Sequence, residues 1–383
     1  MLKIIKHITV YRDEYWYSAF PGAAAIGNGR IAVCFRRAPR YRGLPGLKPG
    51  WYSHLDPNSK LMICFSEDNG NSWSKPELLL APYEGCAQDG GMFYDGKYLY
   101  ANTFIWGHIT RFAVEALDAA GNNEFIYAGN CVPTSTHIGS VSMRSADGGK
   151  TWEEPVFPEP LPGGLEALPG RPLMMHNRAN IIRSADGRLF YCGQALRYRP
   201  EYHSSVVLYE SKDDGASWQF LSTAADHKGT AVFEEPFLYI TPSGKFVMLM
   251  RTHRGPGGEH ISRAHLWITE STDGGYTWSE PVDTGVHAEP PCAQRLADGK
   301  VMVAYGYRIE PETGVRVRIC NPELTDLATA EEIIIRDDGE RADTGYPQIV
   351  PLGENKYMIF YYMNPLSDEG RSNGIYGTVV EVE

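Results

Sequence analysis

One octapeptide pattern, Ser-x-Asp-x-Gly-x-Ser/Thr-Trp, constrains the fold of this chain more than any other feature of its sequence. The pattern occurs four times, beginning at Ser66, Ser145, Ser211 and Ser271. Each copy follows a short apolar run typical of a β-strand. Within the pattern, the aspartate can accept backbone N–H bonds across a turn, the glycine supplies a positive φ, and the tryptophan covers apolar side chains. We therefore predict four structural turns rather than four catalytic sites.

A second pattern, a turn followed by a basic residue and an apolar run, occurs six times. Asn-Gly and Asp-Gly pairs between apolar runs are a strong signal for a β-hairpin. The copies span residues 27–30, 95–97, 186–188, 243–245, 298–300 and 353–356. Each hairpin has about 64 residues available (383/6), enough for a four-stranded sheet with its loops. A closed ring of such sheets leaves only short edges. We predict an all-β, six-bladed β-propeller of four-stranded antiparallel blades, with residues 1–383 as a single domain.

Composition agrees with many short strands and limits the possible partners. The chain has 40 glycines, 26 prolines and 12% aromatic residues, which favours turns and strands over long helices. Its formal charge is −11, from 36 basic and 47 acidic residues, which argues against nucleic acid and against an anionic membrane surface. No run approaches the ~18 apolar residues of a transmembrane helix.

The N-terminal segment and the cysteines bear on location and cofactors. Residues 1–16 lack the apolar stretch and cleavage site of a signal peptide, so we expect a cytoplasmic protein. The seven cysteines are scattered and form no CxxC spacing, and the eleven histidines form no HExxH spacing. We expect no disulfide framework, no catalytic metal and no cofactor.

Asp boxes, as we call the octapeptides, interleaved with six such hairpins resemble the sialidase (neuraminidase) superfamily of Asp-box, or BNR-repeat, six-bladed β-propellers. The resemblance covers nearly the whole chain. It implies a site in which three arginines bind the substrate carboxylate, a tyrosine with a glutamate partner is the nucleophile, and an aspartate is the acid/base. A guanidinium can form two parallel bonds to a carboxylate, and a neutral tyrosine avoids the repulsion that an anionic nucleophile would meet there. The boxes specify the fold rather than the activity.

The fourth hairpin carries the clearest correspondence to the family. Sialidases have a glutamate on the strand that enters this hairpin and an arginine on the strand that leaves it. Here Glu235 lies nine residues before Gly244, and Arg251 lies seven after it. The resemblance implies that Glu235 is the partner of the tyrosine and that Arg251 belongs to the triad, with Glu234 as the alternative glutamate on the other face of the strand. Tyr346, just before the sixth hairpin, corresponds to the nucleophile.

The third arginine and the acid/base each have alternatives. The resemblance implies Arg316, at the start of the strand after the fifth hairpin, while Arg308 and Arg318 are alternatives nearby. For the acid/base it implies Asp56, which lies ten residues before the first Asp box. His54 is an alternative proton carrier with a pKa suited to neutral pH. An ordinary turn at Asp56 is the structural alternative.

The first blade departs from the family pattern. Sialidases begin with an Arg-Ile-Pro motif whose arginine is the first of the triad, and Ala19 stands at that position, ten residues before Gly29. Alanine cannot hold a carboxylate. Arg37, in the basic segment after this hairpin, is the candidate to replace the arginine; otherwise that segment is a solvated face and the substrate is not a sialic acid. We therefore expect poor activity on simple sialosides.

Two further segments are expected near the central axis. One contains Arg178, which follows His176 and Asn177, and the other contains Asp89 in the second blade. Both Arg178 and Asp89 can contact the sugar. The sequence thus predicts a glycoside hydrolase resembling exo-α-sialidases, which cleaves a terminal acidic sugar, sialic acid or a related one, from an anionic carbohydrate partner. The alternatives are a lyase or hydrolase of uronate-containing glycans and a non-catalytic glycan-binding propeller. A tyrosine–glutamate pair argues against the last, because binding alone does not need it.

Overall fold

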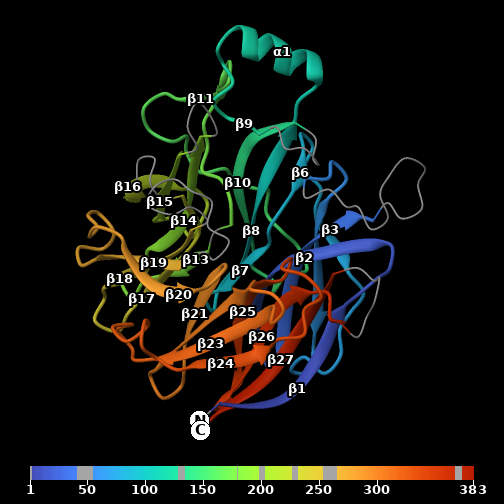
Figure 1. The fold of residues 1–383 in the computed structure, drawn as a ribbon, viewed down its shortest axis with the longest axis vertical. Helices are drawn as coiled ribbons and strands as arrows, with labels where there is room; N and C mark the ends of the chain where they lie inside the picture. The colour runs from blue at the N-terminus through green and yellow to red at the C-terminus, as the bar shows by residue number, and fades with distance from the viewer. Residues whose placement is uncertain are drawn as a thin grey trace.

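Six antiparallel sheets surround a central axis (Figure 1). The computed structural model describes residues 2–40, 55–127, 134–178, 180–197, 203–226, 232–252, 265–366 and 373–383. Each of the six turns found in the sequence joins the first two strands of one sheet. The predicted six-bladed, all-β propeller is confirmed.

Blades 1 to 3 follow one another along the chain. Blade 1 contains β2 (Trp16–Gly27), β3 (Arg30–Pro39), β4 (Lys60–Ser66) and β5 (Glu77–Leu80). Blade 2 contains β6 (Cys86–Ala87), β7 (Gly91–Tyr94), β8 (Leu99–His108), β10 (Ser135–Ser145) and β9 (Ile126–Tyr127). Blade 3 contains β13 (Ile181–Arg183), β14 (Leu189–Arg197), β15 (His203–Ser211) and β16 (Gln219–Asp226). In blade 2, both β6 and β7 pair with β8, so its innermost strand is interrupted at residues 88–90.

Blades 4 to 6 complete the ring. Blade 4 contains β17 (Phe233–Ile240), β18 (Phe246–Thr252), β19 (His265–Ser271) and β20 (Val282–His287). Blade 5 contains β21 (Pro291–Arg295), β22 (Val301–Tyr307), β23 (Gly314–Cys320) and β24 (Glu332–Arg336). Blade 6 contains β25 (Gly345–Gly353), β26 (Lys356–Met363), β27 (Gly374–Val382) and the N-terminal β1 (Leu2–Tyr11). Because β1 pairs with β27, the two ends of the described chain lie together and the ring is closed (Figure 1).

A few elements lie outside the blades. The helix α1 (Arg111–Ala119) stands in the connection between β8 and β10, and the Thr110 side chain caps it by accepting from Ala113 N at 3.3 Å. A two-stranded sheet, β11 (Glu166–Leu168) and β12 (Arg171–Pro172), lies between blades 2 and 3 in the chain. No helix among the described residues is long and apolar enough to cross a membrane.

The Asp boxes form the predicted turns. In the first box, Asp68 Oδ1 accepts from Ser72 N at 2.8 Å and from Ser66 Oγ at 2.8 Å. The other three boxes repeat both bonds. Hydrogen bonds from Ser72 and Ser66 lower the pKa of Asp68 to about 2. Since the first and third strands of a blade run in the same direction, the boxes lie at the end of the propeller where the innermost strands finish.

The tryptophans of the boxes connect neighbouring blades. Trp218 Nε1 donates to Ser142 Oγ of blade 2 at 2.8 Å, and Trp278 Nε1 donates to Ser222 Oγ of blade 3 at 3.0 Å. Trp218 is buried, and the other three box tryptophans are half-buried. Because these bonds join side chains of different blades, we expect the boxes to stabilise the ring.

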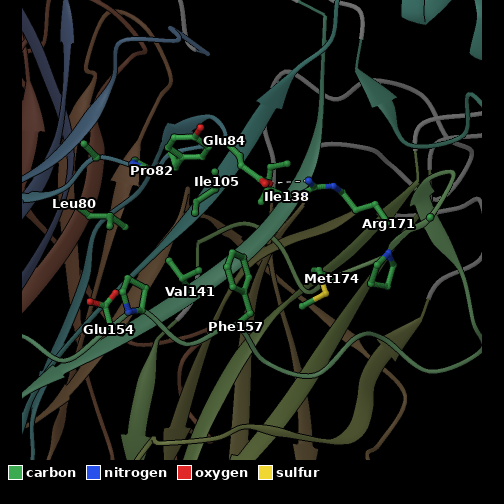
Figure 2. Close-up of a pocket in the computed structure, with 15 residues that line it drawn as sticks. Leu80, Pro82, Glu84, Ile105, Ile138, Val141, Glu154, Phe157, Arg171 and Met174 are labelled. Atoms are coloured by element: carbon green, nitrogen blue, oxygen red, sulfur yellow. Dashed lines mark hydrogen bonds and ion pairs between the residues drawn. The ribbon is translucent and has the colours of Figure 1, made fainter.

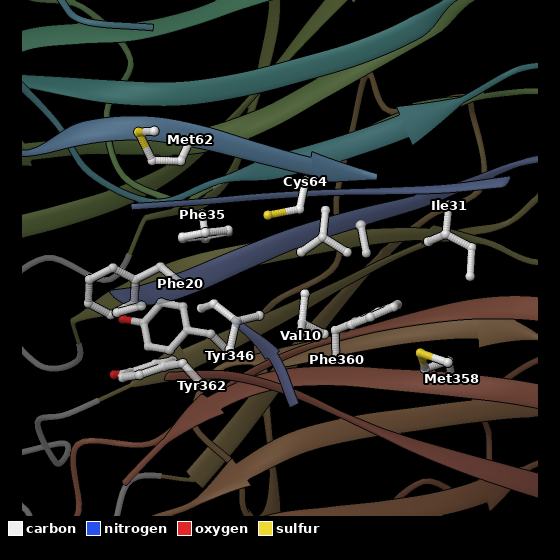
Figure 3. Packing of buried hydrophobic residues seen from close by; sticks show 14 of the residues in the cluster. Val10, Phe20, Ile31, Phe35, Met62, Cys64, Tyr346, Met358, Phe360 and Tyr362 are labelled. Atoms are coloured by element: carbon white, nitrogen blue, oxygen red, sulfur yellow. The ribbon is translucent and has the colours of Figure 1, made fainter. Parts of the chain in front are cut away.

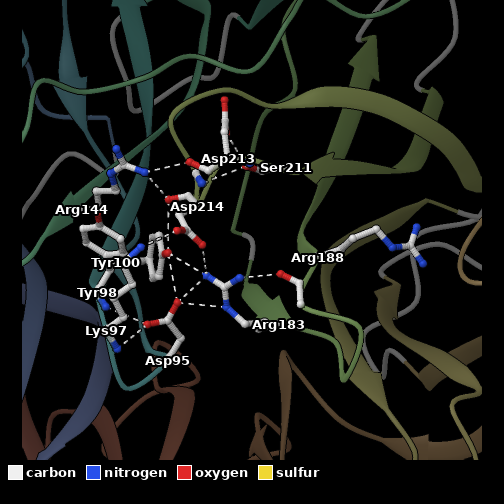
Figure 4. Close-up of polar contacts among 12 residues, drawn as sticks. Asp95, Lys97, Tyr98, Tyr100, Arg144, Arg183, Arg188, Ser211, Asp213 and Asp214 are labelled. Carbon is white, nitrogen blue, oxygen red and sulfur yellow. Dashed lines mark hydrogen bonds and ion pairs between the residues drawn. The ribbon is translucent and has the colours of Figure 1, made fainter.

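Charged side chains add a second connection between blades 2 and 3. Arg183 of β13 pairs with Asp95 at 2.5 Å and with Asp214 at 2.8 Å (Figure 4). Tyr100 OH also donates to Asp95, at 3.1 Å. The network contains none of the predicted site residues, so we assign it a structural role.

Apolar side chains fill the spaces between blades, and Figure 3 shows the cluster between blades 1 and 6. Ala19 is fully buried in this cluster, together with Phe20 and Tyr346. Close packing of the innermost strands requires glycine, because a Cβ on Gly22 of β2 would lie 2.6 Å from the Cα of Gly91 in β7. The innermost strands of blades 1 and 2 therefore lie very close to each other.

Candidate active site

Side chains from all six blades line a cavity of about 250 Å³ where the innermost strands begin. One part of its wall is charged or phenolic and contains Asp89, Glu235, Arg251, Arg308, Asp343 and Tyr346. The other part is mostly apolar and contains Phe20, Leu55, Phe104, Trp106, His176 and Leu196. Among the described residues, no group of three or more His, Cys, Asp or Glu side chains lies close enough to hold a metal ion.

Tyr346 and Glu235 meet in this cavity, as the resemblance implied. The Tyr346 hydroxyl donates to Glu235 Oε1, and both side chains are buried. Burial, with the neighbouring charge of Glu235, raises the pKa of Tyr346 well above its usual value. Tyr346 is therefore a phenol at rest, and Glu235 is placed to take its proton.

A backbone bulge directs both side chains toward the axis. Glu235 has φ 48° and Tyr346 has φ 54°, and the strand register shifts at each position. Phe20, at the same place in β2, has φ 57°. Positive φ is uncommon for residues other than glycine and costs about 1–3 kcal/mol, which the surrounding fold must offset. Each of the three residues precedes a proline.

Glu289, which the sequence analysis missed, positions two arginines. Its Oε2 lies 2.9 Å from Arg251 Nη2 and 3.8 Å from Arg308 Nη1. Arg251 Nη1 also pairs with Glu235 at 2.7 Å, and Arg308 Nε donates to Thr344 O at 3.0 Å. Arg251 Nε is buried and has no hydrogen-bond partner among the described residues. Glu289 also precedes a proline, as Phe20, Glu235 and Tyr346 do. This shared feature of the sequence could have drawn attention to Glu289.

The structure corrects the choice of arginine in blade 5, because Arg308 lines the cavity and Arg316 does not. Arg316 is buried within the blade, where it donates to the backbone carbonyls of Glu312, at 2.9 Å, and Arg336. Arg318 Nε donates to Tyr305 OH at 3.0 Å. Both lie inside β23, whereas Arg308 follows the end of β22.

The structure also places Arg37 outside the cavity. Its guanidinium lies over the Trp16 ring, 4.4 Å from the centroid. The preceding Arg36 is fully buried, with its guanidinium 5.4 Å from the Tyr17 ring centroid. Adjacent residues of a strand face opposite sides, so the basic segment contributes Arg36, rather than Arg37, to the interior.

Asp56 adopts the turn that was its structural alternative. Its Oδ1 accepts from Asn58 N at 2.7 Å, and its backbone carbonyl accepts from Ser59 N at 3.0 Å. Asp56 is buried but does not line the cavity, although its neighbour Leu55 does. His54 lies outside the described residues.

Asp89 and Arg178 lie close to the tyrosine. Asp89 lines the cavity and is only 4% exposed. Burial raises the pKa of Asp89 to about 8; Arg178 opposes this shift and Glu235 adds to it. Arg178 is buried, with its Cζ 4.9 Å from the Tyr346 ring centroid, and its Nη2 donates to Pro21 O at 3.3 Å. The carboxyl of Asp89 is therefore largely protonated at neutral pH.

The apolar part of the wall includes neutral histidine. The His176 ring lies 4.5 Å from the Phe104 ring and 4.5 Å from the Trp106 ring, and His137 packs behind it at 3.8 Å. Burial lowers the pKa of His176 well below its usual value and that of His137 to about 3. Asn177 donates to Gln194. This wall suits an uncharged part of a ligand.

A larger cavity, about 740 Å³, lies elsewhere on the propeller, along blade 2 and the segment that leads to blade 3 (Figure 2). It is lined mainly by apolar side chains such as Ile138 and Phe157. Glu84 and Arg171 form an ion pair of 2.7 Å at its edge. None of the predicted site residues lines it.

Comparisons with known proteins agree with the fold. The family model described as "BNR repeat-like domain" matches residues 125–359. The chain is similar to a solved protein of unknown function from Dyadobacter fermentans DSM 18053 (30% identity, TM-score 0.87, covering 100% of this chain and 99% of that one). It is also similar to a mutant of the NanB sialidase from Streptococcus pneumoniae (13% identity, TM-score 0.61, covering 98% of this chain and 70% of that one). A further similar structure is Trypanosoma rangeli sialidase (14% identity, TM-score 0.58, covering 95% and 55%). At these identities the two sialidases show a shared fold alone. A search of curated proteins found no match.

Proposed function

This chain belongs to the family of BNR repeat-like domains, and on that premise we propose that it is a glycoside hydrolase that cleaves a terminal acidic sugar from a glycan. The observation that carries the proposal is the buried hydrogen bond from Tyr346 to Glu235. A phenol that hands its proton to a carboxylate becomes a nucleophile without adding charge to the site. Tyr346 would attack the anomeric carbon while Glu235 accepts the proton.

Arg251 and Arg308 support an acidic substrate. Both line the cavity beside Tyr346, and Glu289 holds them in place. Arg251 Nε has no hydrogen-bond partner among the described residues, so it can donate a hydrogen bond to a ligand. A carboxylate is the group that guanidinium donors bind most specifically.

The size of the cavity supports action at a chain end. Ligand pockets for small molecules usually enclose ~300–1,000 Å³, and this cavity, at about 250 Å³, is smaller. It suits one sugar ring, with the rest of the glycan outside.

Two cavity arginines instead of three favour a second candidate substrate, a uronate-containing glycan. Ala19 is in the core and Arg316 in blade 5, so neither supplies the third arginine of the sialidase triad. A protein that acts on uronate-containing glycans can be a lyase or a hydrolase. Product analysis separates these two reactions, because a lyase leaves an unsaturated product that absorbs in the near ultraviolet and a hydrolase does not.

The test uses the purified full chain with aryl sialosides and aryl uronosides, followed by labelling with a fluorinated analogue of the sugar that is cleaved. We expect release of the aryl alcohol and a covalent sugar on the peptide that contains Tyr346. Tyr346→Phe should lose at least ~10³-fold in kcat with little change in binding. Binding of these sugars without cleavage, or a label on another residue, would contradict the proposal.

A further inference from the structure

We propose that Asp89 is the catalytic acid and base of this site, the group that protonates the departing oxygen and later deprotonates the attacking water. The inference rests on the proposed function and names a residue for a step that the family resemblance assigned to Asp56. It places this role in blade 2 rather than in the loop of blade 1.

The position of Asp89 is fixed by its neighbours. Gln88 N donates to Phe104 O at 3.0 Å, and Gly90 N donates to Phe20 O at 3.0 Å. A Cβ on Gly90 would lie 2.8 Å from Cys34 Sγ, so the backbone is packed tightly there. The Asp89 side chain therefore projects from a rigid segment into the wall of the cavity that also contains Tyr346.

One oxygen of Asp89 is left for a ligand. Its Oδ2 is buried and has no hydrogen-bond partner among the described residues. A buried carboxyl oxygen without a partner is costly unless something binds it. The glycosidic oxygen, or the water that replaces it, is a partner of suitable chemistry.

The charges around Asp89 determine its protonation. Arg178, Arg36 and Arg251 favour the carboxylate, whereas Glu235 disfavours it. Burial outweighs the three arginines, and the pKa of Asp89 is about 8. A carboxyl that holds its proton at neutral pH can donate it, which an ordinary exposed aspartate cannot do.

Other carboxylates near the cavity are less suited to this role. Asp56 already accepts from Asn58 N and lies outside the cavity wall. Asp343 accepts from Tyr362 OH at Oδ1, at 2.7 Å, and from Tyr17 OH at Oδ2, at 2.9 Å, so both of its carboxylate oxygens already have donors.

The two steps balance in protons and bonds. In the first, the Tyr346 oxygen bonds to the anomeric carbon, its proton moves to Glu235, the glycosidic C–O bond breaks, and the Asp89 proton moves to the departing oxygen. In the second, a water oxygen bonds to the anomeric carbon and its proton moves to Asp89. The bond to Tyr346 breaks, and the phenolate recovers its proton from Glu235.

The decisive experiment compares Asp89→Asn with wild type on two glycosides of the same acidic sugar. An alkyl glycoside needs a proton on its leaving oxygen, whereas an aryl glycoside with an acidic phenol does not. We expect kcat/KM to fall about 10²–10⁴-fold for the alkyl substrate and much less for the aryl substrate. Azide should restore turnover of the aryl substrate by giving a glycosyl azide, because azide needs no base. Asp56→Asn is the matched control, and it should show no such dependence on the leaving group.

Equal losses on both substrates without azide rescue would overturn the proposal, and so would the leaving-group pattern in Asp56→Asn. A wild-type protein that cleaves no acidic glycoside would instead contradict the proposed function. A measurement without substrate tests the protonation separately. In ¹³C NMR of carboxyl-labelled protein, the signal absent from Asp89→Asn should titrate near pH 8, and titration below pH 5 would also overturn the proposal.

Discussion

The guanidinium of Arg178 faces the ring of Tyr346, with its Cζ 4.9 Å from the ring centroid, although the two residues come from blades 3 and 6. Phe20, from blade 1, lies 4.7 Å from the same ring, centroid to centroid (Figure 3). With the hydrogen bond to Glu235 of blade 4, the proposed nucleophile contacts three blades besides its own, and a buried cation lies beside it. A nearby positive charge stabilises the negative charge that develops on the Tyr346 oxygen when it loses its proton.

Replacing Arg178 should therefore slow the reaction. A cation beside the ring stabilises the phenolate that forms in the transition state more than the resting phenol, by about 1.4–2 kcal/mol, the scale of a desolvated cation–π contact. Arg178→Met should therefore lower kcat by about 10–30-fold and change KM less. Arg178 also lowers the pKa of Asp89, so the basic limb of the pH–rate profile should move to higher pH. Arg178→Lys should recover part of kcat. Loss of thermal stability with an unchanged pH profile would indicate a packing role only.

Glu289→Gln should weaken substrate binding. Glu289 pairs with Arg251 at 2.9 Å and approaches Arg308 at 3.8 Å, so its charge keeps both guanidinium groups in place. A charged hydrogen bond contributes roughly 1.5–3 kcal/mol. We expect KM to rise about 10–100-fold, with a smaller effect on kcat, in steady-state kinetics. The exposed Glu280→Gln serves as a control, and equal effects of the two variants would contradict this role.

Ala19→Arg, which restores the first arginine of the sialidase pattern, should destabilise the fold rather than improve binding. Ala19 is fully buried in the apolar cluster with Phe20 and Tyr346. An unpaired buried charge costs about 3–5 kcal/mol, which urea unfolding can measure. A stable variant with increased affinity for an aryl sialoside would show that the new arginine reaches the cavity.

Asp273→Asn should lower stability at neutral pH and have a smaller effect in acid. Hydrogen bonds from Thr277 and Ser271 lower the pKa of Asp273 from 3.8 to about 2. Its stabilising contribution is therefore present above pH 4 and is lost as the pH falls toward 2. Thermal unfolding should show a lower Tm for the variant at pH 7 and a smaller difference from wild type at pH 2. The control variant Asp337→Asn, at an exposed position, should show neither effect. The reaction that the Asp273→Asn variant catalyses should be the same as that of the wild type.

The repeats could be interpreted without a structure because they are local. In each Asp box, the aspartate bonds to residues two and four positions away, so the turn depends on a few adjacent side chains. The number of blades follows from counting such turns. Glu235 and Arg251 could also be placed, because the two strands of one hairpin pair directly and the Cα of Glu234 lies opposite that of Arg251.

The sequence by itself thus determined the propeller and the residues attached to its hairpins, whereas the tertiary structure decided which charges reach the cavity. Arg308 rather than Arg316 reaches it because β22 ends before the former and β23 contains the latter. Glu289 contacts Arg251, and Arg178 contacts Tyr346, in each case from a different blade. The pKa of Asp89 is raised because segments distant in the sequence bury it. The burial of these side chains and their distances across blades depend on the closed ring, so they cannot be predicted from a local pattern of residues.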